Sequence, residues 1–201
     1  MKKIFFATSN FSKVKRFSKE LLKKNIEIIC INDIKANRRI DVEENGKDAI
    51  ENALIKARAY SDVINIPIIA MDDNLFIDDI PNDLQPGMFV RRVNGKRLDD
   101  QEMIEYYAKL AHKYGKNGKL TCRWKYGMAL IKDGKESVYT WNKEDFIIVD
   151  KPTDKINPGY PLNTISINKK LNKYFTDITE EDKTNLHEDE NDVIEFISNN
   201  I

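Results

Sequence analysis

The sequence has 201 residues, of which 41% are hydrophobic and 33% charged, enough for one sizeable domain or two lobes sharing a core. Its 33 basic residues are balanced by 33 acidic ones, which disfavours a nucleic-acid-binding module, since that class carries a broad basic surface. The N-terminal apolar run is too short for a signal peptide or a membrane span, so we expect no membrane partner.

The chain begins with a pattern typical of a strand, a polar turn and a helix. Residues Ile4–Ala7 are apolar, Thr8-Ser9-Asn10 are polar, and apolar residues recur at helical spacing from about Ser12 to Lys24. Backbone N–H groups at such a helix start, together with Lys13, are suited to hold phosphate. A second interpretation is an ordinary N-cap supplied by Ser9, Asn10 or Ser12. Taken alone, this segment slightly favours the N-cap.

A second strand and a second helix follow. Residues Ile26–Ile31 predict the strand, and the small residues spaced along Lys47–Val63 predict a helix that packs closely on a sheet. Glu43 and Glu44 precede this helix and either complement its dipole or belong to a cation site. Lys56, on the same helix, has the pattern of a solvated surface residue.

The stretch Pro67–Leu75 is the strongest local signal. The apolar run Ile68–Met71 predicts a buried strand that ends at the paired carboxylates Asp72 and Asp73. Two adjacent acids at the end of an apolar strand repel each other unless a cation or hydrogen bonds compensate. Oxygen ligands favour Mg²⁺, so this edge of the sheet is a candidate metal site. The alternative is a solvated acidic turn.

The second half of the chain predicts further α/β structure. We expect a helix over Asp99–Lys113, strands over Leu120–Ile131, Glu136–Trp141 and Phe146–Val149, and a last helix over Asp192–Ile201. Asp133-Gly134 predicts a tight hairpin between the first two strands. Cys30 and Cys122 lie in apolar stretches without metal or disulfide spacing, which is typical of reduced core cysteines in a cytoplasmic protein.

Four fragments occur in an order that points to a known family. They read Thr8-Ser9-Asn10-x-x-Lys13, then Glu44-x-Gly46 with Glu51-Asn52-Ala53-x-x-Lys56-Ala57, then Ala70-x-Asp72-Asp73, then Pro86-Gly87-x-Phe89-x-x-Arg92. Together they resemble the inosine triphosphate pyrophosphatase family. The resemblance implies one α/β domain over residues 1–201, with an elongated mixed β-sheet flanked by helices and two lobes with an active-site cleft between them. It also implies a homodimer and Mg²⁺-dependent hydrolysis of non-standard purine nucleoside triphosphates such as ITP, dITP and XTP to monophosphate and pyrophosphate, removing aberrant nucleotides from the pool.

The resemblance also implies roles for individual residues. Glu44 and Asp73 would bind the metal, and Asp73 would act as general base with Asp72 beside it. The remaining residues would bind substrate, and they are Thr8, Ser9, Asn10, Lys13, Lys56, Asn74, Arg92, Tyr160 and Lys183.

The chain departs from the family pattern in two places. After the acid motif, Asn74 and Leu75 replace a Ser and a Gly, which alters the backbone close to the phosphates. Where the family grips the base, the segment around Tyr160 lacks an expected aspartate. His187 matches the family's histidine only with a one-residue shift, and no arginine follows it. Two functions remain open: a pyrophosphatase with altered base preference, or a divergent nucleotide-binding or sensor protein of the same fold with weak activity.

Overall fold

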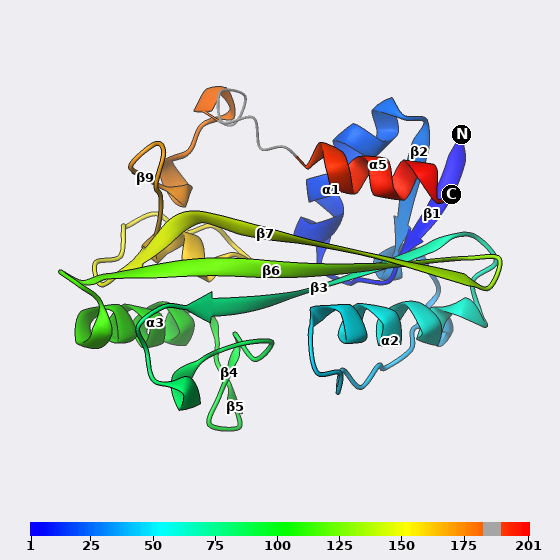
Figure 1. Cartoon of the computed structure of the whole chain (residues 1–201). Helices are drawn as coiled ribbons and strands as arrows, with labels where there is room; N and C mark the ends of the chain where they lie inside the picture. The colour runs from blue at the N-terminus through cyan, green and yellow to red at the C-terminus, as the bar shows by residue number, and fades with distance from the viewer. Residues whose placement is uncertain (183–189) are drawn as a thin grey trace. The chain divides into compact units, whose positions relative to one another are not determined.

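The computed structural model describes residues 1–182 and 190–201, which form a mixed sheet flanked by helices (Figure 1). Lys183 and His187 lie outside the described residues. Seven strands follow the order β2-β1-β3-β6-β7-β8-β9. The chain divides into two compact units. The first contains Met1–Asp73, Tyr126–Trp141 and the C-terminal helix, and the second contains Asn74–Lys125 and residues 142–182. The expected mixed α/β fold class is confirmed.

The first unit is built on parallel strands. Strand β1 (Lys2–Phe6) pairs in parallel with β2 (Ile26–Cys30) and with β3 (Ile68–Ile77), and helix α1 (Phe11–Lys23) connects the first two. Side chains alternate across β1, so that Phe6 packs against Phe17 of α1 while Phe5 packs against Tyr60. The two faces of the sheet are therefore covered by different helices.

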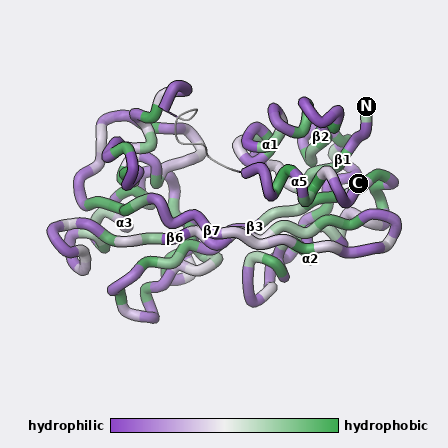
Figure 2. The backbone as a smooth tube through the Cα atoms, turned by 45° about the horizontal axis from the view of Figure 1, so that its top comes forward, coloured by the Kyte–Doolittle hydropathy of each residue, from purple (hydrophilic) through white to green (hydrophobic). Residues whose placement is uncertain are grey.

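Helix α2 (Ala49–Ser61) covers the Phe5 face, and α1 and α5 (Asn191–Asn199) lie on the other (Figure 1). Green and purple alternate along the coil of α1, as expected of a helix with one buried face (Figure 2). Ala53 and Ala57 of α2 are fully buried, and a Cβ on Gly127 of the sheet would meet the backbone of Ala49 at 2.6 Å. Small residues therefore let this helix approach the strands closely.

The second unit has its own core. Helix α3 (Asp100–Tyr114) packs Met103, Tyr107 and Leu110 on the inner residues of the strands, including Phe146 and Ile148. Its short strands are β4 (Arg92–Val93), β5 (Lys96–Arg97), β8 (Ser166–Asn168) and β9 (Lys173–Tyr174). Among the described residues, no helix is long and apolar enough to cross a membrane.

Two long strands carry the chain through both units. Strands β6 (Lys119–Lys132) and β7 (Lys135–Val149) are joined at Asp133 and Gly134, whose φ angles of 49° and 75° fit the predicted tight turn. The prediction of two strands over Glu136–Trp141 and Phe146–Val149 is wrong, because β7 is continuous. The polar residues between Trp141 and Phe146 are alternately exposed and partly buried. From the sequence, such a polar stretch fits either a half-exposed strand or a loop between two strands. Cys30 and Cys122 are buried and free, as predicted.

Candidate active site

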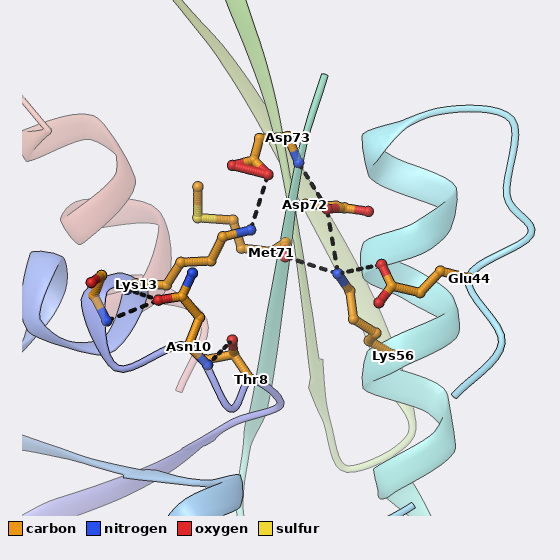
Figure 3. Close-up of polar contacts among 9 residues, drawn as sticks. Thr8, Asn10, Lys13, Glu44, Lys56, Met71, Asp72 and Asp73 are labelled. Carbon is orange, nitrogen blue, oxygen red and sulfur yellow. Dashed lines mark hydrogen bonds and ion pairs between the residues drawn. The ribbon is translucent and has the colours of Figure 1, made fainter. Parts of the chain in front are cut away.

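The turn between β1 and α1 is organised by the side chain of Asn10. Its Oδ1 atom accepts hydrogen bonds from the backbone N–H groups of Ser12 at 2.9 Å and Lys13 at 3.4 Å. Thr8 Oγ1 in turn accepts from the N–H of Asn10 at 3.1 Å (Figure 3). Asn10 is thus the N-cap of α1, one of the three caps that the sequence allowed. This cap fixes the start of the helix, so that Lys13 lies one turn inside it.

Strand β3 does not end at its acids, contrary to the sequence prediction. It runs through Asp72 and Asp73 to Ile77, because residues beyond the acids are again mostly buried and the acids themselves are compensated by lysines. Successive side chains of a strand point to opposite faces. Asp72 and Asp73 therefore extend to opposite sides of β3 (Figure 3). They lie just past the carboxyl end of β1, whose Phe6 pairs with Ile69.

Asp73 is paired with Lys13. Their Nζ and Oδ1 atoms are 3.0 Å apart, and the two side chains are 18% and 30% exposed. Burial lowers the pKa of the Lys13 ammonium, but nearby carboxylates, led by Asp73, more than offset this effect and the pKa is raised. Lys13 therefore stays protonated at neutral pH and is strongly held by negative charge.

Lys56 is the second largely buried cation of the site. Its Nζ atom lies 3.0 Å from Glu44 Oε2, 3.1 Å from the Met71 carbonyl oxygen and 3.5 Å from Asp72 Oδ1 (Figure 3). Its side chain is only 13% exposed, so the expectation of a solvated surface lysine is wrong. The reason is that α2 presents this side chain toward β3, where three oxygen atoms converge.

The loop before α2 brings Glu44 to this lysine. The buried side chain of Asn52 accepts a hydrogen bond from the Gly46 N–H at 2.8 Å, and a Cβ on Gly46 would approach the Asn52 amide oxygen to 2.7 Å. Asp48, rather than Glu44, caps the helix. Of the two interpretations of Glu44, the geometry favours membership of the acid cluster over complementing the helix dipole.

These residues share one cavity of about 330 Å³ in the first unit. Its lining includes seven of the predicted site residues, namely Thr8, Ser9, Asn10, Lys13, Glu44, Lys56 and Asp72. Asp73 is tied to it through Lys13. Asp41, which the sequence reasoning passed over, also lines the cavity, and the Tyr60 hydroxyl holds its loop by accepting from the Ile40 N–H at 3.1 Å.

The donor set suits a hard divalent cation that is bound together with phosphates. The Glu44 carboxylate, the Asp72 carboxylate and a backbone carbonyl already surround one positive charge, the Lys56 ammonium. Within residues 1–182 and 190–201, no three His, Cys, Asp or Glu side chains gather into a ready-made metal site. Mg²⁺ commonly takes one or two carboxylates and completes its shell with water and substrate phosphates, so the residues fit this ion.

A family model places the chain among known proteins. The model described as the Ham1 family matches residues 4–190. The chain belongs to the Ham1 family. A dITP/XTP pyrophosphatase of Halalkalibacterium halodurans is 30% identical over 92% of this chain and 92% of its own length. A dITP/XTP pyrophosphatase of Bacillus subtilis is 28% identical over 92% and 90% of the two chains.

Solved structures agree on the Ham1 fold. The Ham1 protein of Staphylococcus aureus superposes with a TM-score of 0.74 at 21% identity, covering 98% of this chain and 99% of that one. A Ham1 protein from Coxiella burnetii gives a TM-score of 0.72 at 23% identity, covering 99% and 98%. The family model and the pyrophosphatase relatives confirm the resemblance stated from the four sequence fragments.

Three other predicted residues of this Ham1 chain lie in the second unit. Asn74 is buried, and its Oδ1 atom finds no hydrogen-bond partner among the described residues. Arg92 is exposed in β4, and Tyr160 is 42% exposed before a short 3₁₀ helix. Lys183 is outside the described residues. The roles of these four residues remain predictions.

Arg16 is a charged residue of α1 that is largely buried, with a side chain only 23% exposed. Its guanidinium carbon lies 4.5 Å from the ring centroid of Tyr126, and it forms an ion pair with Glu190 before α5. Burial lowers the pKa of the Arg16 guanidinium. Tyr126 and Glu190 raise it by more than burial lowers it, so the pKa lies above its ordinary value. The burial of Arg16 depends on aromatic residues of strands that are distant in the sequence. The spacing of residues along the chain does not predict that these strands pack against α1.

Proposed function

We propose that this Ham1 family member hydrolyses nucleoside triphosphates to the monophosphate and pyrophosphate, with dITP, XTP and ITP as the substrate class. The observation that carries the proposal is a cavity lined by Glu44, Asp72 and two largely buried lysines, with Asp73 paired to Lys13 at its side, just beyond the end of β1. Ligands of open α/β sheets bind at such carboxyl ends. The curated relatives named dITP/XTP pyrophosphatase, aligned over most of their length, support this choice of substrate.

In the proposed reaction, a water oxygen attacks the α-phosphorus and the bond from this phosphorus to the bridging oxygen breaks. Asp73 accepts the proton of the water, and Asp72 lies beside it on the strand. Lys13 and Lys56 neutralise phosphate oxygens as negative charge moves onto the leaving pyrophosphate. The Thr8–Asn10 turn holds the phosphate chain at the start of α1.

We further propose that the reaction depends on Mg²⁺. From the sequence we expect Glu44 and Asp73 as its ligands, whereas in the structure Glu44 shares its lysine with Asp72. Glu44 and Asp72 are therefore the pair that we now favour. When bound, Mg²⁺ polarises phosphate oxygens and lowers the pKa of water.

The substitutions in the base-reading segments support an altered base preference. A pocket that lacks polar partners for a base discriminates poorly against analogues. We also propose a single domain that forms a homodimer in the cytoplasm. The dimer rests on the family resemblance, and the compartment rests on the buried, free cysteines.

The direct test is the initial rate of pyrophosphate release with Mg²⁺ from ITP, XTP, dITP, GTP, ATP, dUTP and dCTP. We expect turnover of ITP, XTP and dITP above the standard nucleotides, by a margin that the altered base-reading segments make small. Turnover of a different set would keep the hydrolase and replace the substrate class. No turnover of any member, with triphosphate still bound, would overturn the proposal in favour of the sensor function.

A further inference from the structure

Two lysines and three carboxylates at or beside the cavity form ion pairs with one another. We call this set the ion-pair cluster, and it consists of Lys13, Glu44, Lys56, Asp72 and Asp73. Lys13 pairs with Asp73, while Lys56 pairs with both Glu44 and Asp72. Both groups that the proposed function assigns to phosphate are thus already bound to carboxylates.

Lys56 occupies the place that a divalent cation would need. Its Nζ atom lies within 3.5 Å of two carboxylates and one backbone carbonyl, contributed by Glu44, Asp72 and Met71. Such oxygen atoms are the ligands that Mg²⁺ accepts, at about 2.0–2.1 Å. An ammonium and a metal ion cannot both fill this point, because their charges repel and their ligands are the same.

A polyphosphate changes this balance. If the lysines turn to phosphate oxygens, the carboxylates that they leave are unpaired, and one of them is largely buried, since the Asp72 side chain is only 14% exposed. Leaving a buried charge without its partner is strongly unfavourable. A divalent cation restores the balance. Asp41 lines the same cavity and adds to the need for positive charge.

We propose that Lys56 excludes the divalent cation from the nucleotide-free protein and releases its oxygen ligands only when it moves to a phosphate of the substrate. Lys13 makes the matching move from Asp73. The cation and the triphosphate therefore bind cooperatively, each raising the affinity of the other by the same factor. This exchange rests on the proposed function, because it needs a polyphosphate in the cavity.

The exchange assigns a purpose to the burial of Lys56. A solvated lysine would reach a phosphate equally well, but it would leave Glu44 and Asp72 open to any divalent cation. Held against three oxygen atoms, Lys56 instead makes the metal site conditional on substrate. The protein then avoids assembling a water-activating centre without a triphosphate to cleave.

The test measures binding of Mn²⁺ alone, without nucleotide, from the free-ion signal in electron paramagnetic resonance. Lys56→Met removes the ammonium and leaves the oxygen atoms in place. We expect this variant to bind Mn²⁺ at least about tenfold more tightly than wild type, within the usual range of coupling between sites. Lys23→Met removes an exposed lysine paired with Glu20 and should leave Mn²⁺ binding unchanged.

A double variant identifies the ligands of the Mn²⁺ ion that Lys56→Met binds. Lys56→Met combined with Asp72→Asn should return to the weak Mn²⁺ affinity of the wild type, because one of the two carboxylates is then neutral. If Lys56→Met does not give the circular dichroism spectrum of the folded protein, Lys56→Gln, which keeps polar atoms at this point, carries the same expectation.

The outcomes separate this inference from the proposed function. Wild type and Lys56→Met binding Mn²⁺ equally would overturn the exchange, even if the wild type hydrolyses dITP. A gain in Lys56→Met that Asp72→Asn abolishes would support the exclusion of the cation by Lys56, even if no nucleotide is turned over and the proposed function fails.

Discussion

Asp73 is the residue on which the proposed chemistry depends most. It is partly exposed, and its carboxylate is held 3.0 Å from the Lys13 ammonium, so it is both accessible to water and fixed in place by an ion pair. Asp73→Asn keeps the shape and removes the base. We expect pyrophosphate release to fall by about 10²–10⁴-fold, the usual contribution of a positioned general base. The measurement is kcat with dITP.

A matched control is available at the β6–β7 turn. Asp133 lies at the exposed tip with a φ of 49°, a conformation that asparagine also tolerates, so Asp133→Asn should keep full activity. Thermal unfolding of both variants shows whether the fold survives. Near-normal turnover in folded Asp73→Asn would remove this residue from the base role.

Lys13 makes a second prediction at the residue scale. Its pKa is raised above 10.5 by nearby carboxylates, so the stability that comes from this raised pKa is present at neutral pH and is lost only as pH rises through the raised value. Lys13→Ala should weaken triphosphate binding by roughly tenfold or more, since a hydrogen bond to a charged group contributes about 1.5–3 kcal/mol.

Lys13→Ala should affect monophosphate binding far less, because the lysine is expected to contact the leaving phosphates. Isothermal titration with dITP and dIMP in the absence of metal provides the comparison. Equal losses for both ligands would contradict the placement of Lys13 beside the pyrophosphate group.

At the element scale, the start of α1 depends on one side chain. Asn10 caps the helix that carries Lys13, and its loss leaves the Ser12 and Lys13 N–H groups without their acceptor. Asn10→Ala should lower the free energy of unfolding by about 1 kcal/mol, while Asn10→Ser, also a good N-cap, should lower it less. Urea denaturation of the three proteins measures this. Equal stabilities would show that the cap does not hold the turn.

The sequence predicted the helices well because α1, α2 and α3 each have one buried face that repeats at helical spacing. It failed where tertiary contacts override local polarity. Strand β3 continues through Asp72 and Asp73 because lysines from two helices compensate them, and that compensation requires the folded chain. Motifs in the sequence could nominate the candidate site residues that lie between Thr8 and Asp73. The sharing of Lys56 between Glu44 and Asp72 could not be predicted, because charge pairing across segments leaves no local pattern.

At the scale of the whole molecule, both units belong to one chain that matches its Ham1 relatives over most of its length. The family resemblance predicts a homodimer. Sedimentation velocity at micromolar concentration should give twice the chain mass of 23.4 kDa. A single species at the chain mass over this concentration range would contradict the dimer and leave the hydrolytic proposal intact.

The central claim is that water attacks the α-phosphorus of a non-standard purine triphosphate. Phosphorus nuclear magnetic resonance of dITP incubated with the protein and Mg²⁺ tests it most directly, because it identifies both products. We predict pyrophosphate and dIMP in equal amounts. Orthophosphate and dIDP would mean that the terminal phosphate is cleaved instead, and that the assigned roles of Asp73 and the two lysines are wrong.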